Sequence, residues 1–480
     1  MFILMVIIFV LGYIAIALEH PIKIDKAASA LLIGSLTWVA YIMGGLDILN
    51  LGHSPAWAKY LASHPDAAHG AHGYLEFIVD HEIIHHLGEI SEILFFLLGA
   101  MTIVEIVDTH QGFKIITDRI TTTNKVKLLW VLSILTFFMS AVLDNLTTTI
   151  VMVALLRKLV ADQKSRWFFA SMVVLAANAG GAWSPIGDVT TIMLWIGKQV
   201  TTWNIIVMVL FPSIINILVP LVVLSFVLKG NVDRPVVKAE CDTRKQDTPD
   251  REKTLVLIMG VSALLFVPVF KTVTHLPPYM GMLFGLGVLW VITELMHRKK
   301  HTEVKSKLTV VAILRKVDVP TVLFFLGILS AVASLQSAGH LAILARFLDE
   351  HLGNIYTINI AIGILSAIVD NVPLVAGAMG MYTVYTPEMI AAITDPTAAA
   401  YAEYFMQDGL FWEFLAYCAG TGGSILIIGS AAGVAAMGLE KIDFIWYLKH
   451  ISWIALLGYL AGAGAYYLQS ILLMHGAHHL

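Results

Sequence analysis

Long apolar stretches dominate this chain, and most of them match the length of a membrane-spanning helix. A span needs about 20 predominantly apolar residues. Hydrophobic residues make up 58% of the chain and charged residues only 13%, whereas soluble domains carry about 25% charged residues. These features predict an all-α polytopic membrane protein, and they exclude a soluble enzyme, a nucleic-acid-binding protein and a disordered chain. The apolar stretches are residues 2–18, 27–46, 91–108, 128–156, 167–200, 203–228, 254–270, 279–296, 319–337, 355–385, 409–440 and 450–473.

The positive charges predict how the spans are oriented, because Lys and Arg concentrate on the cytoplasmic side of membrane proteins. One assignment of cytoplasmic segments holds 26 of the 30 Lys and Arg residues. The first stretch has no positive residue before it and no small-residue cleavage site after it, so we interpret it as an uncleaved span. Both termini are then expected outside. The cytoplasmic segments are residues 19–26, 109–127, 157–166, 229–253, 297–318 and 441–449.

Four segments do not fit simple spans in this orientation. Residues 128–156 begin and end on the cytoplasmic side, and residues 355–385 begin and end outside, so each is expected to form a re-entrant hairpin. Residues 167–200 and 409–440 would each form a helix of about 50 Å, too long for a hydrocarbon core of about 30 Å. Both contain Gly-rich interruptions, which indicate broken helices.

The two halves of the chain repeat the same order: three spans, a hairpin, a broken helix and a last span. Asp144-Asn145 of the first hairpin matches Asp370-Asn371 of the second. Each half makes five crossings, an odd number, so the second half begins on the opposite side. This predicts an inverted repeat, the architecture of many secondary transporters. The expected units are residues 1–228, a cytoplasmic linker 229–253, and residues 254–480.

Three carboxylates, Asp144, Asp188 and Asp370, fall at the predicted helix breaks, and no Lys or Arg lies within residues 128–156, 167–197 or 355–440. Charged groups inside a membrane need partners, so the missing partner is expected to be a cation or a proton. Alkali cations prefer oxygen ligands. The predicted cation and proton site comprises Asp144, Asn145, Thr147, Thr148, Asn178, Ser184, Asp188, Thr190, Thr191, Ser366, Asp370 and Asn371.

Coupling follows from acid–base chemistry at such a site. An apolar environment favours the protonated form of a carboxylate, whereas bound sodium favours the ionised form. Sodium and proton then compete for one site, and exchange is obligatory if only the loaded site crosses. Aligning Gly180-Gly181 with Gly422-Gly423, the predicted hinges, places Asp188 opposite Ser430. The main sodium site is therefore expected in the first half, at Asp144 and Asp188, with Asp370 completing it or forming a weaker proton-carrying site.

Specific motifs resemble the NhaD-type sodium/proton antiporters of the ion transporter superfamily. They are the segments His86–Gly99, Leu143–Thr149, Asn178–Thr191 and Ile368–Pro373. The resemblance implies a homodimeric antiporter of the bacterial inner membrane, active in alkaline or saline conditions, that exports sodium and, as a second candidate ion, lithium. It also implies a scaffold and a mobile transport domain with elevator-like movement, and no cofactor.

A competing motif, His81-Glu82-Ile-Ile-His85, matches the zinc-protease pattern HExxH. The third ligand position of the extended pattern is Ser91, which is not comparable, whereas catalytic zinc needs three protein ligands. On a helix, His85 and His86 each lie one turn from Glu89, and Glu92 follows. Because histidine titrates near neutrality, the set His85, His86, Glu89 and Glu92 is a candidate for pH sensing or proton collection.

Three functions therefore stay open from the sequence. The first is sodium/proton antiport. The second is sodium-coupled uptake of a small anion by the same fold, which the scarcity of Lys and Arg in the predicted core disfavours. The third is an intramembrane zinc protease, which the missing third ligand disfavours.

Overall fold

The structure is a computed structural model, and it describes the whole chain except residues 18, 66, 68–70, 118, 235–248, 299–307 and 478–480. All regular elements among the described residues are helices. Eight of these helices are long and apolar enough to cross a membrane, so the chain is a multi-pass helical membrane protein. They are Lys26–Leu49, Gly73–Thr109, Lys125–Leu143, Thr202–Val227, Asp250–Thr274, Pro278–His297, Val319–Ser337 and Ser452–Leu472.

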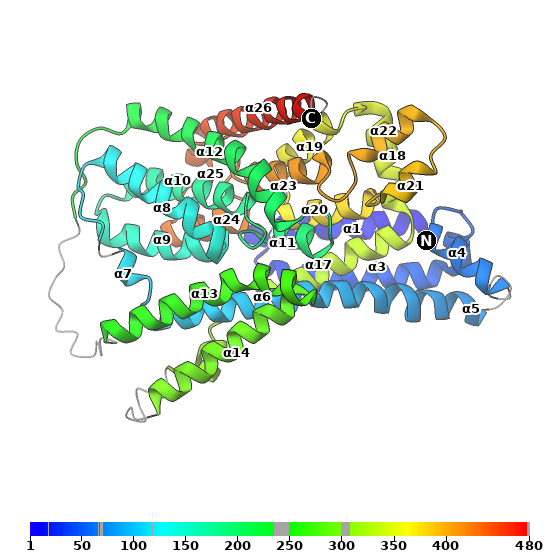
Figure 1. Cartoon of the computed structure of the whole chain (residues 1–480), viewed down its shortest axis with the longest axis horizontal. Coiled ribbons are helices and arrows are strands. Elements are labelled where there is room, and N and C mark those ends of the chain that lie inside the picture. Colours follow the sequence, from blue (N-terminus) through cyan, green and yellow to red (C-terminus); the bar gives the residue numbers. More distant parts are fainter. Residues whose placement is uncertain are drawn as a thin grey trace.

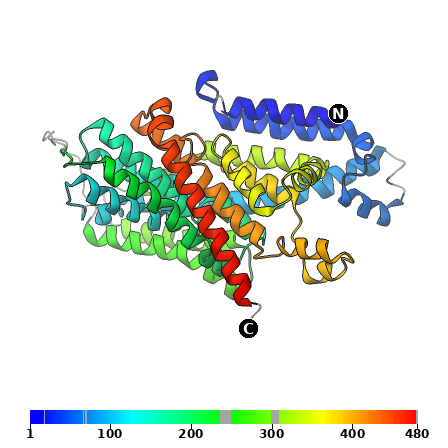
Figure 2. The ribbon, with the colours of Figure 1, turned by 90° about the horizontal axis from the view of Figure 1, so that it is seen from above.

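Six helices form what we call the framework group. Helix α3 packs along α17, and α14 packs along α6, while α1 covers α3 and α13 covers α14. Small residues allow these contacts: a Cβ atom on Gly34 would lie 2.6 Å from the carbonyl oxygen of Gly327. In Figure 1, α13, α14 and α6 lie along the lower edge, and in Figure 2, α1 and α3 form one edge. The group consists of α1 (Phe2–Ala17), α3 (Lys26–Leu49), α6 (Ile84–Thr109), α13 (Asp250–Thr274), α14 (Pro278–His297) and α17 (Val319–Ser337).

The remaining long elements form the hairpin group, in which the helix breaks fall inside the four predicted segments. The first hairpin breaks at Asp144 and the second at residues 366–370, while the broken helices are interrupted at residues 183–188 and 423–430. Their re-entrant path through a membrane stays a prediction. The group consists of α8 (Lys125–Leu143), α9 (Asn145–Leu159), α10 (Gln163–Ala182), α11 (Val189–Ile196), α12 (Thr202–Val227), α19 (Ile355–Leu365), α20 (Asn371–Met381), α23 (Leu410–Gly422), α24 (Ala431–Glu440) and α26 (Ser452–Ala477).

Contacts within the hairpin group occur in matching pairs from the two halves of the chain. Helix α8 packs on α10, and α19 packs on α23 in the same way. Two further contacts join the halves: α9 packs on α24, and α11 packs on α20. Helices α12 and α26, the last of each half, pack against each other at the upper edge of Figure 1. The ends of all four broken elements therefore meet in the middle of the group.

One predicted span has the wrong length. The expected span 91–108 is the end of a continuous helical segment, Gly73–Thr109, of 37 residues. This segment joins α5 (Ala71–Glu76), the π-helix η2 (Phe77–Ile83) and α6. The histidine-rich motif therefore lies within a helix that exceeds a bilayer core, at about 1.5 Å per residue. The expected first span is the 16-residue α1, which is shorter than the eight helices above.

Short helices connect these elements, including the amphipathic α18, which the sequence interpretation missed. They are α2 (Glu19–Ile22), α4 (Pro55–Ser63), α7 (Lys114–Thr117), α16 (Val310–Leu314), α18 (His340–Leu352), α21 (Pro387–Ala391), α22 (Pro396–Glu403) and α25 (Phe444–His450). Most of the predicted linker 229–253 lies outside the described residues.

Candidate functional site

Asp188 lies at the centre of the four helix breaks. It is the N-cap residue of α11 and only 1% exposed. One carboxylate oxygen accepts hydrogen bonds from the backbone N–H and the hydroxyl of Thr190, at 2.8 and 2.7 Å. Thr191 donates its hydroxyl to the Asp188 carbonyl at 2.9 Å. A side chain at an N-cap satisfies the free N–H groups of the first turn, and the positive end of the helix dipole favours the carboxylate there.

The first hairpin brings its tip to this carboxylate. Asn145, 5% exposed, donates its amide to Asp188 and also to the Asn178 side-chain oxygen, the latter at 3.1 Å. Asp144 caps α9 by accepting from the backbone and hydroxyl of Thr147, at 2.8 and 2.9 Å. Asp144 adopts φ +78°. A non-glycine residue in such a region costs about 1–3 kcal/mol and persists only where its surroundings hold it.

Asn178 joins the two broken helices. Its side chain is fully buried in α10, and its amide donates to the hydroxyls of Ser424 and Ser430, at 2.9 and 2.8 Å. Both serines lie in the break between α23 and α24. Sequence reasoning aligned Ser430 with Asp188 but did not assign it or Ser424 to the site, because single serines in an apolar segment give no signal of their own.

The second hairpin contributes Asn371, whose amide lies 3.4 Å from each carboxylate oxygen of Asp188. The neighbouring Asp370 is more exposed than Asp188 and has a different partner. It caps α20, is 15% exposed, and forms an ion pair with Lys26 at 3.7 Å. The expectation that none of the three carboxylates has a basic neighbour is therefore wrong for Asp370. Lys26 precedes it by more than 340 residues, so no local spacing could have revealed the contact.

Asp188 lies within electrostatic reach of both Asp144 and Asp370. The charge of Asp188 acts on Asp144, and the charge of Asp370 acts on Asp188. Among the residues that the structure describes, no basic side chain forms an ion pair with Asp144 or Asp188. The cluster therefore concentrates negative charge and amide and hydroxyl groups where the broken helices meet, which is an arrangement suited to a cation or a proton.

The remaining predicted polar residues hold the breaks or stay unpaired. Ser184 donates its hydroxyl to the Ala141 carbonyl at 2.5 Å, and Ser366 donates to the Ala419 carbonyl at 3.1 Å. The hydroxyl of Thr148 is buried without a hydrogen-bond partner in the described part of the chain. Buried polar groups normally have hydrogen-bond partners. The Thr148 hydroxyl is therefore available as a further oxygen ligand beside the first hairpin tip.

The four glycines act through close packing. A Cβ atom on Gly180 would lie 2.2 Å from the Phe137 carbonyl oxygen, and one on Gly181 would lie 2.4 Å from that of Gly187. Equivalent contacts surround Gly422 and Gly423, at 2.0 and 2.6 Å. None of the four has a positive φ, so the unusual dihedral angles expected of hinges are absent from this conformation. Their role as hinges stays a prediction.

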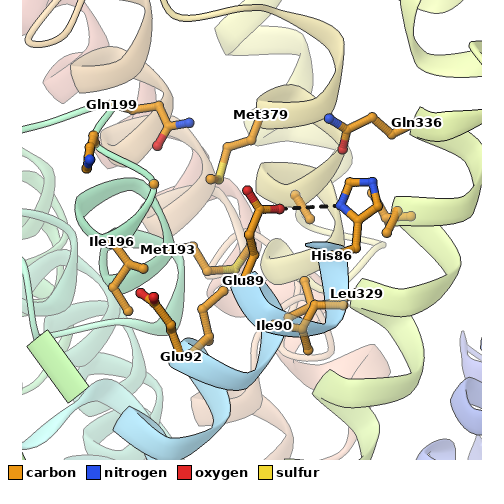
Figure 3. Close-up of a pocket in the computed structure, with 16 residues that line it drawn as sticks. His86, Glu89, Ile90, Glu92, Met193, Ile196, Gln199, Leu329, Gln336 and Met379 are labelled. Atoms are coloured by element: carbon orange, nitrogen blue, oxygen red, sulfur yellow. Dashed lines mark hydrogen bonds and ion pairs between the residues drawn. The ribbon is translucent and has the colours of Figure 1, made fainter. Parts of the chain in front are cut away.

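The histidine and glutamate set borders a separate cavity of about 430 Å³ between α6, α11, α17 and α20. Figure 3 shows Glu89 pointing into this cavity beside Met193, with an interaction to His86. The His86 Nδ1 atom lies 3.3 Å from the Glu89 carboxylate, and its Nε2 atom lies 3.0 Å from the Ser337 hydroxyl. Glu92 also lines the cavity, whereas His85 lies 3.5 Å from Glu89 on the exposed side.

The zinc-protease interpretation receives no support from this region. Among the described residues, no group of three or more His, Cys, Asp or Glu side chains could hold a metal ion. Residues 77–83, which include the first half of the HExxH pattern, form a π-helix, so the spacing of an α-helical zinc motif is disturbed there.

A buried carboxylate where broken helices meet, inside a bundle of apolar helices, is typical of secondary membrane transporters. The model of the family described as "Citrate transporter" matches residues 3–403. The chain therefore belongs to the citrate transporter family, and it is a transporter and not an enzyme.

Curated relatives agree with this assignment. "Sodium/proton antiporter 1" of Arabidopsis thaliana is 44% identical over 466 residues, which cover 96% of this chain and 71% of that protein. "Sodium/proton antiporter 2" of the same plant is 41% identical over 470 residues, which cover 96% of this chain and 98% of that protein. "Na(+)/H(+) antiporter NhaD" of Alkalimonas amylolytica is 29% identical over 481 residues, which cover 95% of this chain and 88% of that protein. These matches confirm the resemblance to NhaD-type antiporters.

Proposed function

We propose that this protein is a secondary sodium/proton antiporter. The observation that carries the proposal is the environment of Asp188, a buried carboxylate with amide and hydroxyl neighbours from both halves of the chain and no basic partner among the described residues. The names of the relatives, which are sodium/proton antiporters, point to the same two ions. A small anion is disfavoured because the carboxylates of Asp144 and Asp188 would repel it.

The chemistry of exchange rests on a shared carboxylate. Sodium replaces its water with carboxylate, hydroxyl and carbonyl oxygens, which Asp188, Thr190 and the backbone at the helix breaks provide. Asn145 and Asn371 donate to Asp188, so their amides steady the ionised form. A proton on Asp188 removes the charge that holds sodium. The two ions then occupy the site in turn, with Asp144 as the neighbouring carboxylate that completes it.

Two inverted repeats and an elevator-like movement form the architectural part of the proposal. The paired contacts of the hairpin group support the repeat, since the packing of α8 on α10 matches that of α19 on α23, and the packing of α9 on α24 matches that of α20 on α11. Equivalent hydrogen bonds support it as well: Ser140 donates to the Ala177 carbonyl as Ser366 donates to that of Ala419. The framework group would be the scaffold, and the hairpin group would carry the ions.

The cavity beside α6 is proposed as a proton-collecting or pH-sensing site. It lies between the two groups of helices and is lined by the carboxylates of Glu89 and Glu92, the imidazole of His86 and the ammonium group of Lys198. The homodimer, transport of lithium and a role in salt tolerance stay predictions. So does the bacterial inner membrane, because the relatives come from a plant and from bacteria.

Purified protein in proteoliposomes tests the function. An imposed pH gradient should collapse when sodium chloride is added, with no organic anion present, and protein-free liposomes should keep their gradient. If sodium flux occurred only after citrate or another carboxylate was added, the antiporter proposal would be wrong and the anion alternative correct.

A further inference from the structure

One ion pair connects the framework group to a hairpin tip. Lys26 is the first residue of α3, and Asp370 is the N-cap residue of α20. The ammonium nitrogen lies 3.7 Å from the Asp370 carboxylate, and the side chains are 23% and 15% exposed. The same nitrogen lies 4.5 Å from the ring centre of Phe324 in α17. Lys26 is thus held by two framework helices while its charge faces the second hairpin.

The surroundings of this pair are those of a small polar site. Lys26 and Asp370 line a cavity of about 70 Å³ together with Tyr13 and Glu19. This volume is about that of two water molecules. The Tyr13 hydroxyl is buried and has no hydrogen-bond partner among the described residues. A carboxylate and a hydroxyl are oxygen ligands of the kind that an alkali cation takes, and the Lys26 ammonium group lies beside this carboxylate at the same cavity.

The pair is also connected to the central cluster through one residue. Asn371 follows Asp370 directly, and its amide lies 3.4 Å from both carboxylate oxygens of Asp188. These distances exceed those of strong charge-assisted hydrogen bonds, which are about 2.7–2.9 Å. A displacement of the Asp370 tip would therefore shorten or break this contact and change how Asp188 is held.

We propose that Lys26 is a built-in competitor of the transported cation at Asp370, and that its ion pair holds the second hairpin against α3 until an ion replaces it. The inference rests on the proposed antiport function. Lys26 is part of the chain and cannot leave with the cargo. A sodium ion or proton at Asp370 removes the charge that attracts the ammonium group, and the tip is then free to move away from the framework group.

The competition predicts a gain of sodium affinity when Lys26 loses its charge. A partly exposed ion pair contributes about 0–1 kcal/mol, so the concentration of sodium for half-maximal exchange should fall about two- to fivefold in Lys26→Gln. Lys26→Arg should keep the wild-type value. In an Asp370→Asn background, Lys26→Gln should cause no further change. A purely structural contact would lower the exchange rate without improving sodium affinity.

Lys23→Gln is the matched control, because Lys23 lies exposed in the same connection and its loss changes the local charge equally. An equal affinity gain in Lys23→Gln, an unchanged affinity in Lys26→Gln, or an affinity gain that persists without Asp370 would each overturn the inference. Absence of exchange in the wild-type protein would instead overturn the antiport function. Non-additive melting temperatures of Lys26→Gln, Asp370→Asn and the double variant would then still measure the ion pair.

Discussion

The two hairpin tips carry the same dipeptide, Asp-Asn, in two different environments. Asp144 is tied to its own helix by Thr147, at a positive φ, and has no basic partner in the described residues. Asp370 has φ −47° and is paired with Lys26 of a distant helix. Both following asparagines nevertheless donate to Asp188. The two asparagines thus both contact Asp188, whereas only Asp370 of the two preceding carboxylates is paired with a basic residue among those that the structure describes.

The two helix breaks differ in the same direction. A glycine pair lies at or just before the start of each break, and its first glycine, Gly180 or Gly422, packs closely against a hairpin. Each break ends with an N-cap side chain, Asp188 in the first and Ser430 in the second. Only the first cap carries charge. Under the proposed antiport function, this difference predicts that cation binding is concentrated in the first half of the chain.

Asp188→Asn is expected to have the largest effect. The substitution keeps the size of the side chain and removes the titratable charge, so exchange in proteoliposomes should fall to the level of protein-free liposomes while the protein still inserts. Asp318→Asn is the control, since Asp318 is also a helix cap, bonded to Thr321, but lies exposed. Sodium-driven proton release at the wild-type rate in Asp188→Asn would rule Asp188 out as essential.

Replacing each hairpin-tip carboxylate in a separate variant distinguishes the roles of Asp144 and Asp370. Asp144→Asn should eliminate sodium binding, because it removes charge beside Asp188 that no basic residue balances. Asp370→Asn should change sodium affinity within about tenfold, or 1.4 kcal/mol, since Lys26 already balances that charge. Sodium titrations of both purified variants measure the difference. Retained tight binding in Asp144→Asn, with complete loss in Asp370→Asn, would place the main site in the second half.

Gly181→Val tests whether the first break depends on close packing. A Cβ atom there would lie 2.4 Å from the Gly187 carbonyl oxygen, so the break must open, and transport should fall far more than membrane insertion. Gly438→Val in α24 is the matched control, because a Cβ atom at Gly438 would meet nothing within 4 Å. Full transport activity of Gly181→Val, measured in the same proteoliposome assay, would show that this contact is dispensable.

The smallest effect is expected from Ser430→Ala. Ser430 accepts from Asn178 and caps α24 by accepting from the Gly433 N–H at 3.1 Å. Its loss should cost about 1 kcal/mol of stability, seen as a lower melting temperature, while exchange continues. Loss of exchange as complete as in Asp188→Asn would mean that both breaks bind the cation on equal terms.

The class of protein and the parts of the site could be predicted from the sequence. The length of the apolar stretches predicts membrane helices, because the hydrocarbon core of a bilayer has a nearly fixed thickness. Asp144, Asp188 and Asp370 attract attention because charge in an apolar segment is expensive. Gly180-Gly181 and Gly422-Gly423 mark the breaks because closely approaching backbones require residues without a Cβ atom. All of these are local properties, which neighbouring residues reveal on their own.

Contacts between distant segments decided the rest. Asn178 reaches Ser424 and Ser430, some 250 positions later in the chain, and Lys26 reaches Asp370. The spacing of residues along a helix carries no information about such pairs, because they depend on how whole helices pack. The long helix through Gly73–Thr109 also escaped prediction, since a π-helical turn and polar histidines interrupt the apolar pattern without ending the helix. The sequence thus determined which groups are available, and the packing of the two halves decided which of them meet around Asp188 and Asn178.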